Sequence, residues 1–304
     1  MNQPENAIVL AVGPDGSTAG LAFAVAEART SHRPVHLVHV LEIPTGEAYV
    51  STHDRCLDVA TKTLDTALAS AKELAAGTIP VTGEVVDNGW TVERLVTQGK
   101  DAAMLVLQHR HQGKLRRLVS GSFANRVAAR AAVPVVSVPE DWTADTADRT
   151  VVTAAVQDPH EAGLLLRAAF AEAQQVHADL VILHAWWLAS GYDGVVVDQA
   201  MRDEWAARTR DELAPVLDEL KARFPDVHAT VRVRHAPPVE AVLDAALESR
   251  LLVIGRRHHL LPLGSHLGPV ARAALDRAGC PVLVTPEAKP VAPAGPAPLV
   301  SAVR

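Results

Sequence analysis

The sequence predicts an α/β protein with two tandem domains, each a doubly wound fold around a five-stranded parallel sheet. The main observation is an internal repeat: residues 101–140 and 248–287 align without a gap and share Gly, Pro-Val and Pro-Glu at matching positions. Each half also has five short apolar segments that alternate with helical patterns, which is typical of a parallel sheet covered on both faces. The 304 residues suffice for about two such domains. The repeat therefore indicates one domain made twice.

In the first half, the elements follow from apolar runs and the turn residues that end them. An apolar run at residues 7–12 stops at a Gly-Pro-Asp-Gly turn, after which Ser17 or Thr18 can cap a helix. The longest helix carries leucines near helical spacing. We expect strands at residues 7–12, 35–41, 80–86, 104–107 and 133–138, and helices at residues 18–29, 52–74, 91–96 and 121–131.

The second half repeats this order after a polar, acidic segment. We expect strands at residues 151–156, 179–186, 228–233, 251–254 and 281–285, and helices at residues 160–176, 198–223, 239–248 and 270–278. The fifth strand of each half is an apolar edge, and such edges are usually covered. We therefore expect the two halves to pack as a pseudo-twofold pair through these strands.

These elements divide the chain into four parts. We expect a first domain at residues 1–142, a linker at 143–149, a second domain at 150–287 and a tail at 288–304. The tail is rich in Pro and Ala and poor in side chains that could pack, which predicts disorder.

Composition narrows the class of protein. The net charge of −6 and the pI of about 6.1 argue against a nucleic-acid-binding protein, which usually presents a basic face. The two cysteines lie in different halves, so a disulfide framework is not expected and a reducing compartment is favoured. The sequence shows neither a signal-peptide pattern nor an apolar run long enough to span a membrane. We expect a cytoplasmic protein without membrane partners.

The candidate site lies where ligands bind such sheets, outside the carboxyl ends of the strands at the point where strand order reverses. If the first strand is central and the fourth lies beside it, two loops meet there. These are the loop that holds Asp15 and the loop at residues 108–120.

Several motifs in this order resemble the universal stress protein family, in its tandem two-domain bacterial form. They are Asp-Gly-Ser at 15–17 after the first strand, His-Val at 39–40 closing the second, and Ala-Val-Pro-Val at 132–135. The resemblance covers both halves. It implies an adenine-nucleotide alpha-hydrolase-like fold with strand order 3-2-1-4-5, and a homodimer of the tandem chain.

The resemblance also implies roles for residues. In nucleotide-binding members the Asp lies near adenine and ribose, the residue that ends the second strand offers its backbone to adenine, and a glycine loop wraps the phosphates. Backbone N–H groups at a helix N-terminus attract anions. The candidate residues in the first domain are Asp15, Gly16, Ser17, Val40, Gln108, Arg110, His111, Gly121, Ser122 and Phe123. In the second domain they are Asp158, Ala185, Gly255, Arg257, His258 and Gly268.

Both halves depart from the family's glycine motif, which is Gly, two residues, Gly, nine residues, Gly, then Ser or Thr. The first half has Gln108, His111, Gly121 and Ser122 at these positions, and the second has Gly255, His258, Gly268 and Pro269. A non-glycine residue forced to positive φ costs roughly 1–2 kcal/mol, although nearby arginines favour phosphate. We therefore expect ATP or AMP to bind weakly, with no cofactor required.

Two alternatives come from other classes: a nucleotide-free scaffold for an unknown protein partner, and, ranked lowest, a slow ATPase. Asp15 could simply stabilise its turn, and Gly121-Ser122 could simply start a helix. We interpret His39 and His184 as packing residues and Trp186-Trp187 as core or interface aromatics rather than a base-stacking platform. The pattern indicates neither catalytic residues nor a metal site.

Overall fold

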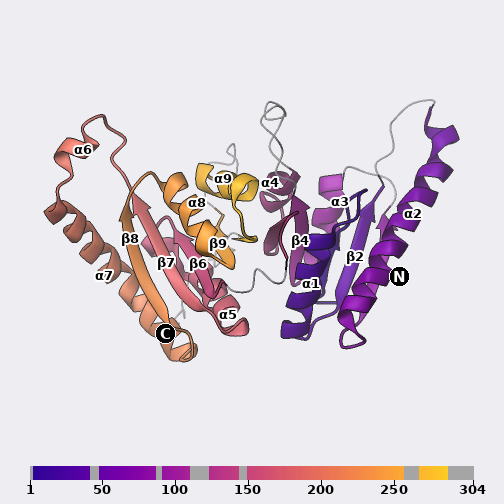
Figure 1. Ribbon diagram of the computed structural model, residues 1–304, viewed down its shortest axis with the longest axis horizontal. Coiled ribbons are helices and arrows are strands. Elements are labelled where there is room, and N and C mark those ends of the chain that lie inside the picture. Colours follow the sequence, from indigo (N-terminus) through magenta and orange to yellow (C-terminus); the bar gives the residue numbers. More distant parts are fainter. Residues whose placement is uncertain are drawn as a thin grey trace, which may run out of the picture.

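The computed structural model of the chain describes residues 3–41, 48–86, 91–109, 123–143, 149–256 and 267–286. Within these ranges ten strands form one sheet, with helices on both faces (Figure 1). The predicted linker at 143–149 lies mostly outside the described residues, and the predicted tail at 288–304 lies wholly outside them.

The first half contains five strands and four α-helices among its described residues. The strands are β1 (Ile8–Ala11), β2 (Val35–Val40), β3 (Val81–Val86), β4 (Met104–His109) and β5 (Val135–Pro139). The helices are α1 (Thr18–Ser31), α2 (Ala48–Ala75), α3 (Thr91–Gln98) and α4 (Phe123–Ala128), with a 3₁₀ turn at Gly99–Asp101.

The described part of the second half repeats this series and adds one short helix, α6. The strands are β6 (Val151–Val156), β7 (Asp179–Trp186), β8 (Ala229–His235), β9 (Leu251–Gly255) and β10 (Val282–Thr285). The helices are α5 (Gly163–Gln175), α6 (Asp193–Val196), α7 (Gln199–Arg223), α8 (Pro238–Glu248) and α9 (Pro269–Arg277), with a 3₁₀ turn at Pro159–Glu161.

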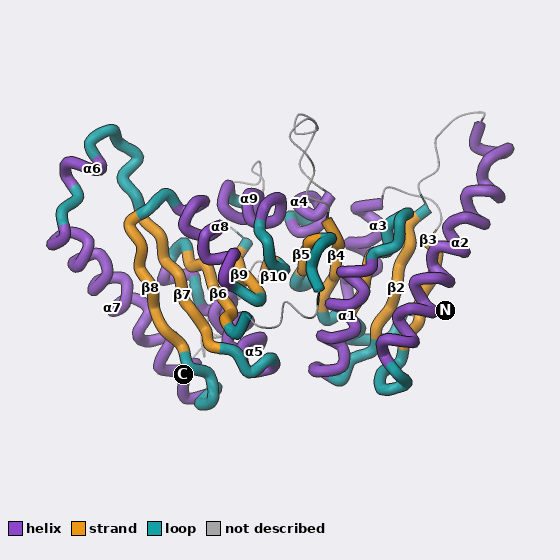
Figure 2. The backbone as a smooth tube through the Cα atoms, in the orientation of Figure 1, coloured by secondary structure: helices purple, strands orange, loops and turns teal. Residues whose placement is uncertain are grey.

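The strand order confirms the predicted topology in each half. It runs β3-β2-β1-β4-β5-β10-β9-β6-β7-β8, so each half reads 3-2-1-4-5 from its outer edge to the centre. Neighbouring strands are parallel within each half, and β5 pairs antiparallel with β10. Figure 2 shows these two strands side by side in the middle of the molecule. The expectation that the fifth strands cover each other is confirmed, and the two predicted sheets form one continuous sheet.

Polar contacts support the central pair on both faces of the sheet. On one face, Asn125 Nδ2 of α4 donates to Asp276 Oδ1 of α9 at 3.1 Å. On the other, Gln175 of α5 donates to the carboxylate of Glu27 on α1. Hydrogen bonds between groups largely withdrawn from water fix register as well as contributing stability. The two domains are therefore joined by backbone pairing and by side chains from flanking helices.

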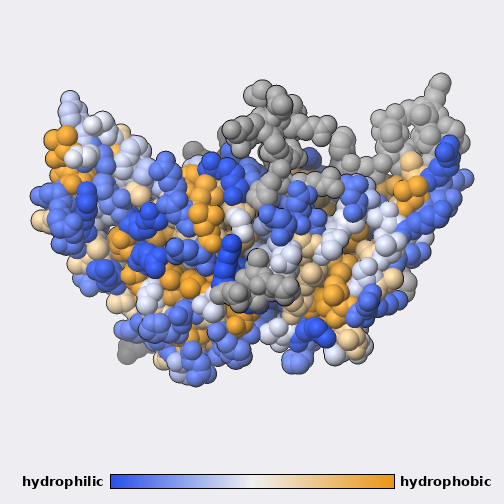
Figure 3. Space-filling model, viewed as in Figure 1, coloured by the Kyte–Doolittle hydropathy of each residue, from blue (hydrophilic) through white to orange (hydrophobic). Residues whose placement is uncertain are grey.

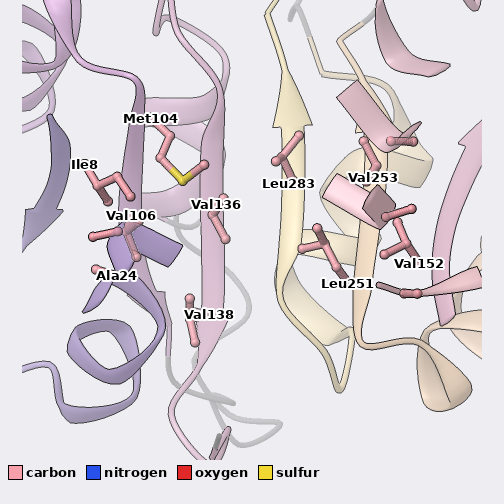
Figure 4. Packing of buried hydrophobic residues seen from close by; sticks show 14 of the residues in the cluster. Ile8, Ala24, Met104, Val106, Val136, Val138, Val152, Leu251, Val253 and Leu283 are labelled. Carbon is pink, nitrogen blue, oxygen red and sulfur yellow. The ribbon is translucent and has the colours of Figure 1, made fainter. Parts of the chain in front are cut away.

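The core forms two layers because side chains alternate across a strand. Ile8 and Leu10 face the layer under α1, α2, α5 and α7, whereas Val9 faces the layer under α3, α4, α8 and α9. Figure 4 shows the first layer from close by, with Val136 of β5 and Leu283 of β10 as neighbours on the two central strands.

Some element bounds differ from the predictions. Helix α2 begins at Ala48, four residues before the predicted start at residue 52, and Leu74 at its end is 44% exposed rather than part of the apolar stripe. Helix α4 ends at Ala128 and not near residue 131, because the chain continues as a turn. The sequence analysis did not foresee α6, since four residues are too few to show a helical period.

Candidate functional site

A cavity lies at the carboxyl edge of the first domain, where strand order reverses. β1 pairs with both β2 and β4, so the carboxyl ends of β1 and β4 lie side by side. The cavity has a volume of about 840 Å³, and Asp15, Val40, Gln108 and Phe123 are among the residues that line it. This volume falls within the range of small-molecule sites. The structure thus brings together predicted residues from four separate segments.

The turn after β1 is stabilised by its own backbone and by one hydroxyl. Gly16 has a φ of 75°, which glycine adopts without steric cost, and its N–H donates to the Gly13 carbonyl at 3.1 Å. Ser17 Oγ accepts from the Gly13 N–H at 3.1 Å and donates to the Ala11 carbonyl at 3.3 Å. Ser17 therefore holds the turn. It occupies the N-cap position of α1, one of the two predicted, but its side chain makes no capping hydrogen bond. The turn presents Asp15 at the cavity, exposed to solvent.

Histidines fasten the end of the second strand to the end of the first strand in both domains. The buried His39 donates from Nδ1 to the Val12 carbonyl at 2.9 Å. His184 does the same to the Val156 carbonyl at 3.1 Å. The interpretation of both as packing residues is confirmed. In the first domain this contact holds the following residue, Val40, at the cavity wall.

Gln108, which stands in place of the first motif glycine, turns its side chain toward α1. Its Oε1 accepts from the Gly20 N–H at 3.0 Å, a donor in the first turn of the helix. Such donors lack partners within the helix, so this amide satisfies one of them. Gly20 permits the approach, because an added Cβ would lie 3.4 Å from Gln108 Cβ and 3.1 Å from Leu10 Cδ1. The large side chain is thereby packed against α1 at the cavity wall.

The rest of the predicted phosphate loop is not among the described residues. Arg110, His111, Gly121 and Ser122 lie outside the described residues, as do Arg257 and His258 in the second domain. Phe123, the first residue of α4, is 37% exposed and lines the cavity.

Helix α2 supplies a wall that the sequence analysis missed. Its residues on the cavity are spaced to share one helix face. They are Arg55, Cys56, Val59, Ala60 and Thr63. The signal was present as a second, weaker stripe beside the leucine stripe. It could have been found by asking which face of this long helix overhangs the end of the sheet.

The equivalent cavity in the second domain is smaller, with a volume of about 340 Å³. Asp158, Ala185, Gly255 and Gly268 all line it, so four predicted residues come together. Asp158 Oδ1 accepts from the His160 N–H at 2.9 Å and caps the 3₁₀ turn.

Arg256, which also lines the second cavity, directs its guanidinium into the first domain. Its Nη1 donates to the Ala128 and Ala131 carbonyls at 3.2 and 2.9 Å, at the end of α4. A cation at a helix C-terminus is favourable. The loop after β9 thus contributes to the contact between the domains.

Other classes of site find no support in the described residues. Among them, no group of three or more His, Cys, Asp and Glu side chains is arranged to hold a metal ion. No helix in the described part of the chain has both the length and the apolar character needed to cross a membrane. Burial raises the pKa of the Cys280 thiol to about 12, which makes it a poor nucleophile.

Comparison with known proteins gives one consistent result. The model of the Universal stress protein family matches residues 6–139 and 149–286. A universal stress protein from Mycobacterium tuberculosis is 30% identical over 207 residues, which are 67% of this chain and 65% of that protein. One from Mycolicibacterium smegmatis is 28% identical over 283 residues, which are 90% of this chain and 95% of that protein.

Solved structures agree on the architecture. The crystal structure of a universal stress protein from Archaeoglobus fulgidus superposes with a TM-score of 0.68 at 15% identity, over 93% of this chain and 99% of that one. The shared feature at this identity is the fold.

Proposed function

Because the chain belongs to the universal stress protein family, we propose that it is a binding protein or stress-response regulator whose first domain binds ATP or AMP weakly. In this proposal the protein works in the cytoplasm, as a homodimer of the tandem chain and with a protein partner. In this proposal it acts by binding and not as an enzyme.

The observation that carries the proposal is the first-domain cavity of about 840 Å³ with Asp15 at its edge. An exposed carboxylate on a turn held by its own hydrogen bonds can accept from ribose hydroxyls. The end of β2 at Val40 can offer backbone groups to the edge of a base. Apolar side chains from α2, α3 and β4 can cover the two flat faces of the base. These are the chemical features that a nucleoside needs.

Weak binding follows from the lost motif glycines. Gln108 lies against α1, so its side chain leaves room for a nucleoside. His111 still replaces a glycine of the phosphate loop. A dissociation constant of about 0.1–1 mM corresponds to roughly 4–5.5 kcal/mol, which a nucleoside pocket with a partial phosphate loop could supply.

The second domain is the weaker candidate. Its cavity is smaller, at about 340 Å³, and Asp158 is used by the 3₁₀ turn. Pro269 at the start of α9 removes one of the N–H donors that would face a phosphate. We propose that nucleotide binding, where it occurs, belongs to the first domain.

The test is calorimetric titration of ATP and AMP into the purified chain, with Asp15→Ala and the matched variant Asp158→Ala. Losing hydrogen bonds to a charged group costs about 1.5–3 kcal/mol, so Asp15→Ala should weaken binding about tenfold or more. Asp158→Ala should leave it unchanged.

Two results would replace the proposal by an alternative. If neither nucleotide binds below about 1 mM and denatured protein releases no nucleotide, the nucleotide-free scaffold is the correct reading. Steady phosphate release that Asp15→Ala abolishes would establish a slow ATPase.

A further inference from the structure

An exposed apolar surface lies beyond the carboxyl ends of β7 and β8, at the outer end of the second domain. We define the aromatic patch as Trp187, Tyr192, Val195, Val196 and Trp205, which are 45%, 73%, 83%, 51% and 37% exposed. In Figure 3, apolar atoms gather at the upper left, where Figure 1 places α6. Contiguous exposed apolar side chains of this kind mark interaction sites.

A set of contacts holds the patch rigid. Trp186 is buried and stacks on Trp205, with ring centroids 5.0 Å apart and planes 18° apart. Asp193 Oδ1 accepts from His235 Nε2 at 2.9 Å and from the Leu188 N–H at 3.0 Å, which ties α6 to the ends of β7 and β8. A surface that is already ordered loses little conformational freedom when it binds a ligand.

The chemistry of the patch suits one kind of ligand. Surfaces lined by Trp and Tyr bind proline-rich segments in the polyproline II conformation, because the flat rings pack against proline rings and the segment is already extended. The chain carries such a segment outside its described residues. Pro290, Pro293 and Pro296 are spaced by three residues, which is one turn of polyproline II, and Pro298 follows. The first three prolines would share one face.

The sheet register shows that this segment can reach the patch. β10 pairs parallel with β9, β9 with β6 and β6 with β7, in a register that places Thr285 level with His184. Three strand spacings amount to about 14 Å, and Trp187 lies three residues, about 10 Å, beyond His184. The eight residues from Thr285 to Pro293 extend about 25 Å as polyproline II. Prolines from 293 onward can therefore lie on the aromatic patch.

We propose that the chain's own C-terminal segment, through Pro293 to Pro298, docks on the aromatic patch in the polyproline II conformation. The segment leaves β10 on the same edge of the sheet as the patch. Docking would cover Trp187 and Tyr192 and would fasten the C-terminal segment to the second domain. This proposal is independent of nucleotide binding in the first domain.

The experiment uses the full chain and a variant in which Pro290, Pro293, Pro296 and Pro298 are replaced by alanine. A labelled synthetic peptide of residues 286–304 is titrated into both. The peptide should bind the variant chain at least about tenfold more tightly than the unmodified chain, whose own segment competes at a high effective concentration. Acrylamide should quench the tryptophan emission of the variant more strongly, since Trp187 is then uncovered.

Substitutions on the patch identify the surface that is bound. In the proline variant, Trp187→Ala or Tyr192→Ala should each weaken peptide binding about tenfold. Leu247→Ala, which removes a 64% exposed apolar side chain on α8, is the matched control and should have no effect. Equal thermal stability of these variants shows that the fold is kept.

Three results would overturn the proposal. The peptide could bind both chains equally, which would mean that the patch is free in the unmodified protein. The patch variants could leave binding unchanged, which would place the segment elsewhere. Sedimentation could show a dimer that the proline substitutions dissociate, in which case the segment docks on a second copy.

Discussion

Two carboxylates from different domains meet between α1 and α5, and their arrangement predicts how stability depends on pH. Glu27 is 8% exposed and accepts a hydrogen bond from Gln175, and burial raises its pKa. Burial, together with the nearby charge of Glu27, raises the pKa of Glu172 to about 8, against a smaller opposing effect of Arg33. Arg33 and Arg250 also favour the charged form of Glu27. The native protein should therefore hold a proton on Glu172 at neutral pH.

The sign of the effect follows from proton linkage. The unfolded chain releases the Glu172 proton near pH 4.5, whereas the folded chain releases it near pH 8. The contribution to stability is thus fully present below about pH 4.5 and is lost as pH rises through 8. The full difference between these pKa values corresponds to about 5 kcal/mol, but Glu172 is half-buried and solvent screens its charge. We expect a loss of about 2 kcal/mol between pH 5 and pH 9.

The substitution Glu172→Gln tests this reasoning, because glutamine keeps the shape and does not ionise. The free energy of unfolding of the variant should equal that of the unmodified chain at pH 5 and exceed it by about 2 kcal/mol at pH 9. Urea denaturation followed by tryptophan fluorescence, repeated from pH 5 to pH 9, measures the free energy of unfolding of both proteins. Glu204→Gln on the exposed face of α7 is the control and should change neither value. Parallel curves for Glu172→Gln and the unmodified chain would refute the argument.

Two further predictions concern packing and thiol reactivity. A Cβ on Gly83 would lie 2.9 Å from the Leu37 carbonyl oxygen, so Gly83→Ala should lower the free energy of unfolding by about 1–3 kcal/mol. Gly279→Ala, where a Cβ meets nothing within 4 Å, should change it by less than about 0.5 kcal/mol. Because burial raises the pKa of Cys280 to about 12, one thiol per native chain should react with a thiol reagent at pH 8. The reactive thiol should be Cys56 in the cavity wall. ATP should slow the reaction of Cys56 if the cavity binds nucleotide.

The sequence predicted the architecture well because the information lies in repeated local patterns. The ten predicted apolar segments are the ten strands of the sheet. The fifth strands of the two halves, β5 and β10, pair with each other, because the apolar edge of either strand would otherwise be exposed to solvent. The strand order itself came from the family resemblance. Periodicity could not give α6 or the early start of α2 at Ala48, since helix ends depend on tertiary contacts.

The site was predicted less completely, for reasons that its residues make clear. Asp15 and Val40 were found because they follow strands directly. The α2 wall was missed because its stripe is weaker than the leucine stripe, and only tertiary contacts place that face of the helix over the cavity. Ser17 takes the predicted N-cap position, but its hydrogen bonds were not foreseen, because a hydroxyl before a helix can also turn back, here to Gly13 and Ala11.

The two cavities show how a duplicated domain can diverge at one position near the end of a strand, Gln108 in β4 and Gly255 in β9. Where the second domain keeps the first motif glycine, Gly255, the next residue is Arg256, which reaches the carbonyls at the end of α4. Where the first domain has lost that glycine, Gln108 packs against Gly20 and leaves a cavity more than twice as large. A missing glycine therefore does not by itself mean a closed site, because the space depends on where the replacing side chain finds its hydrogen bond. If Gln108→Gly enlarged the cavity without strengthening nucleotide binding, the deficit would lie in the loop that follows, at His111.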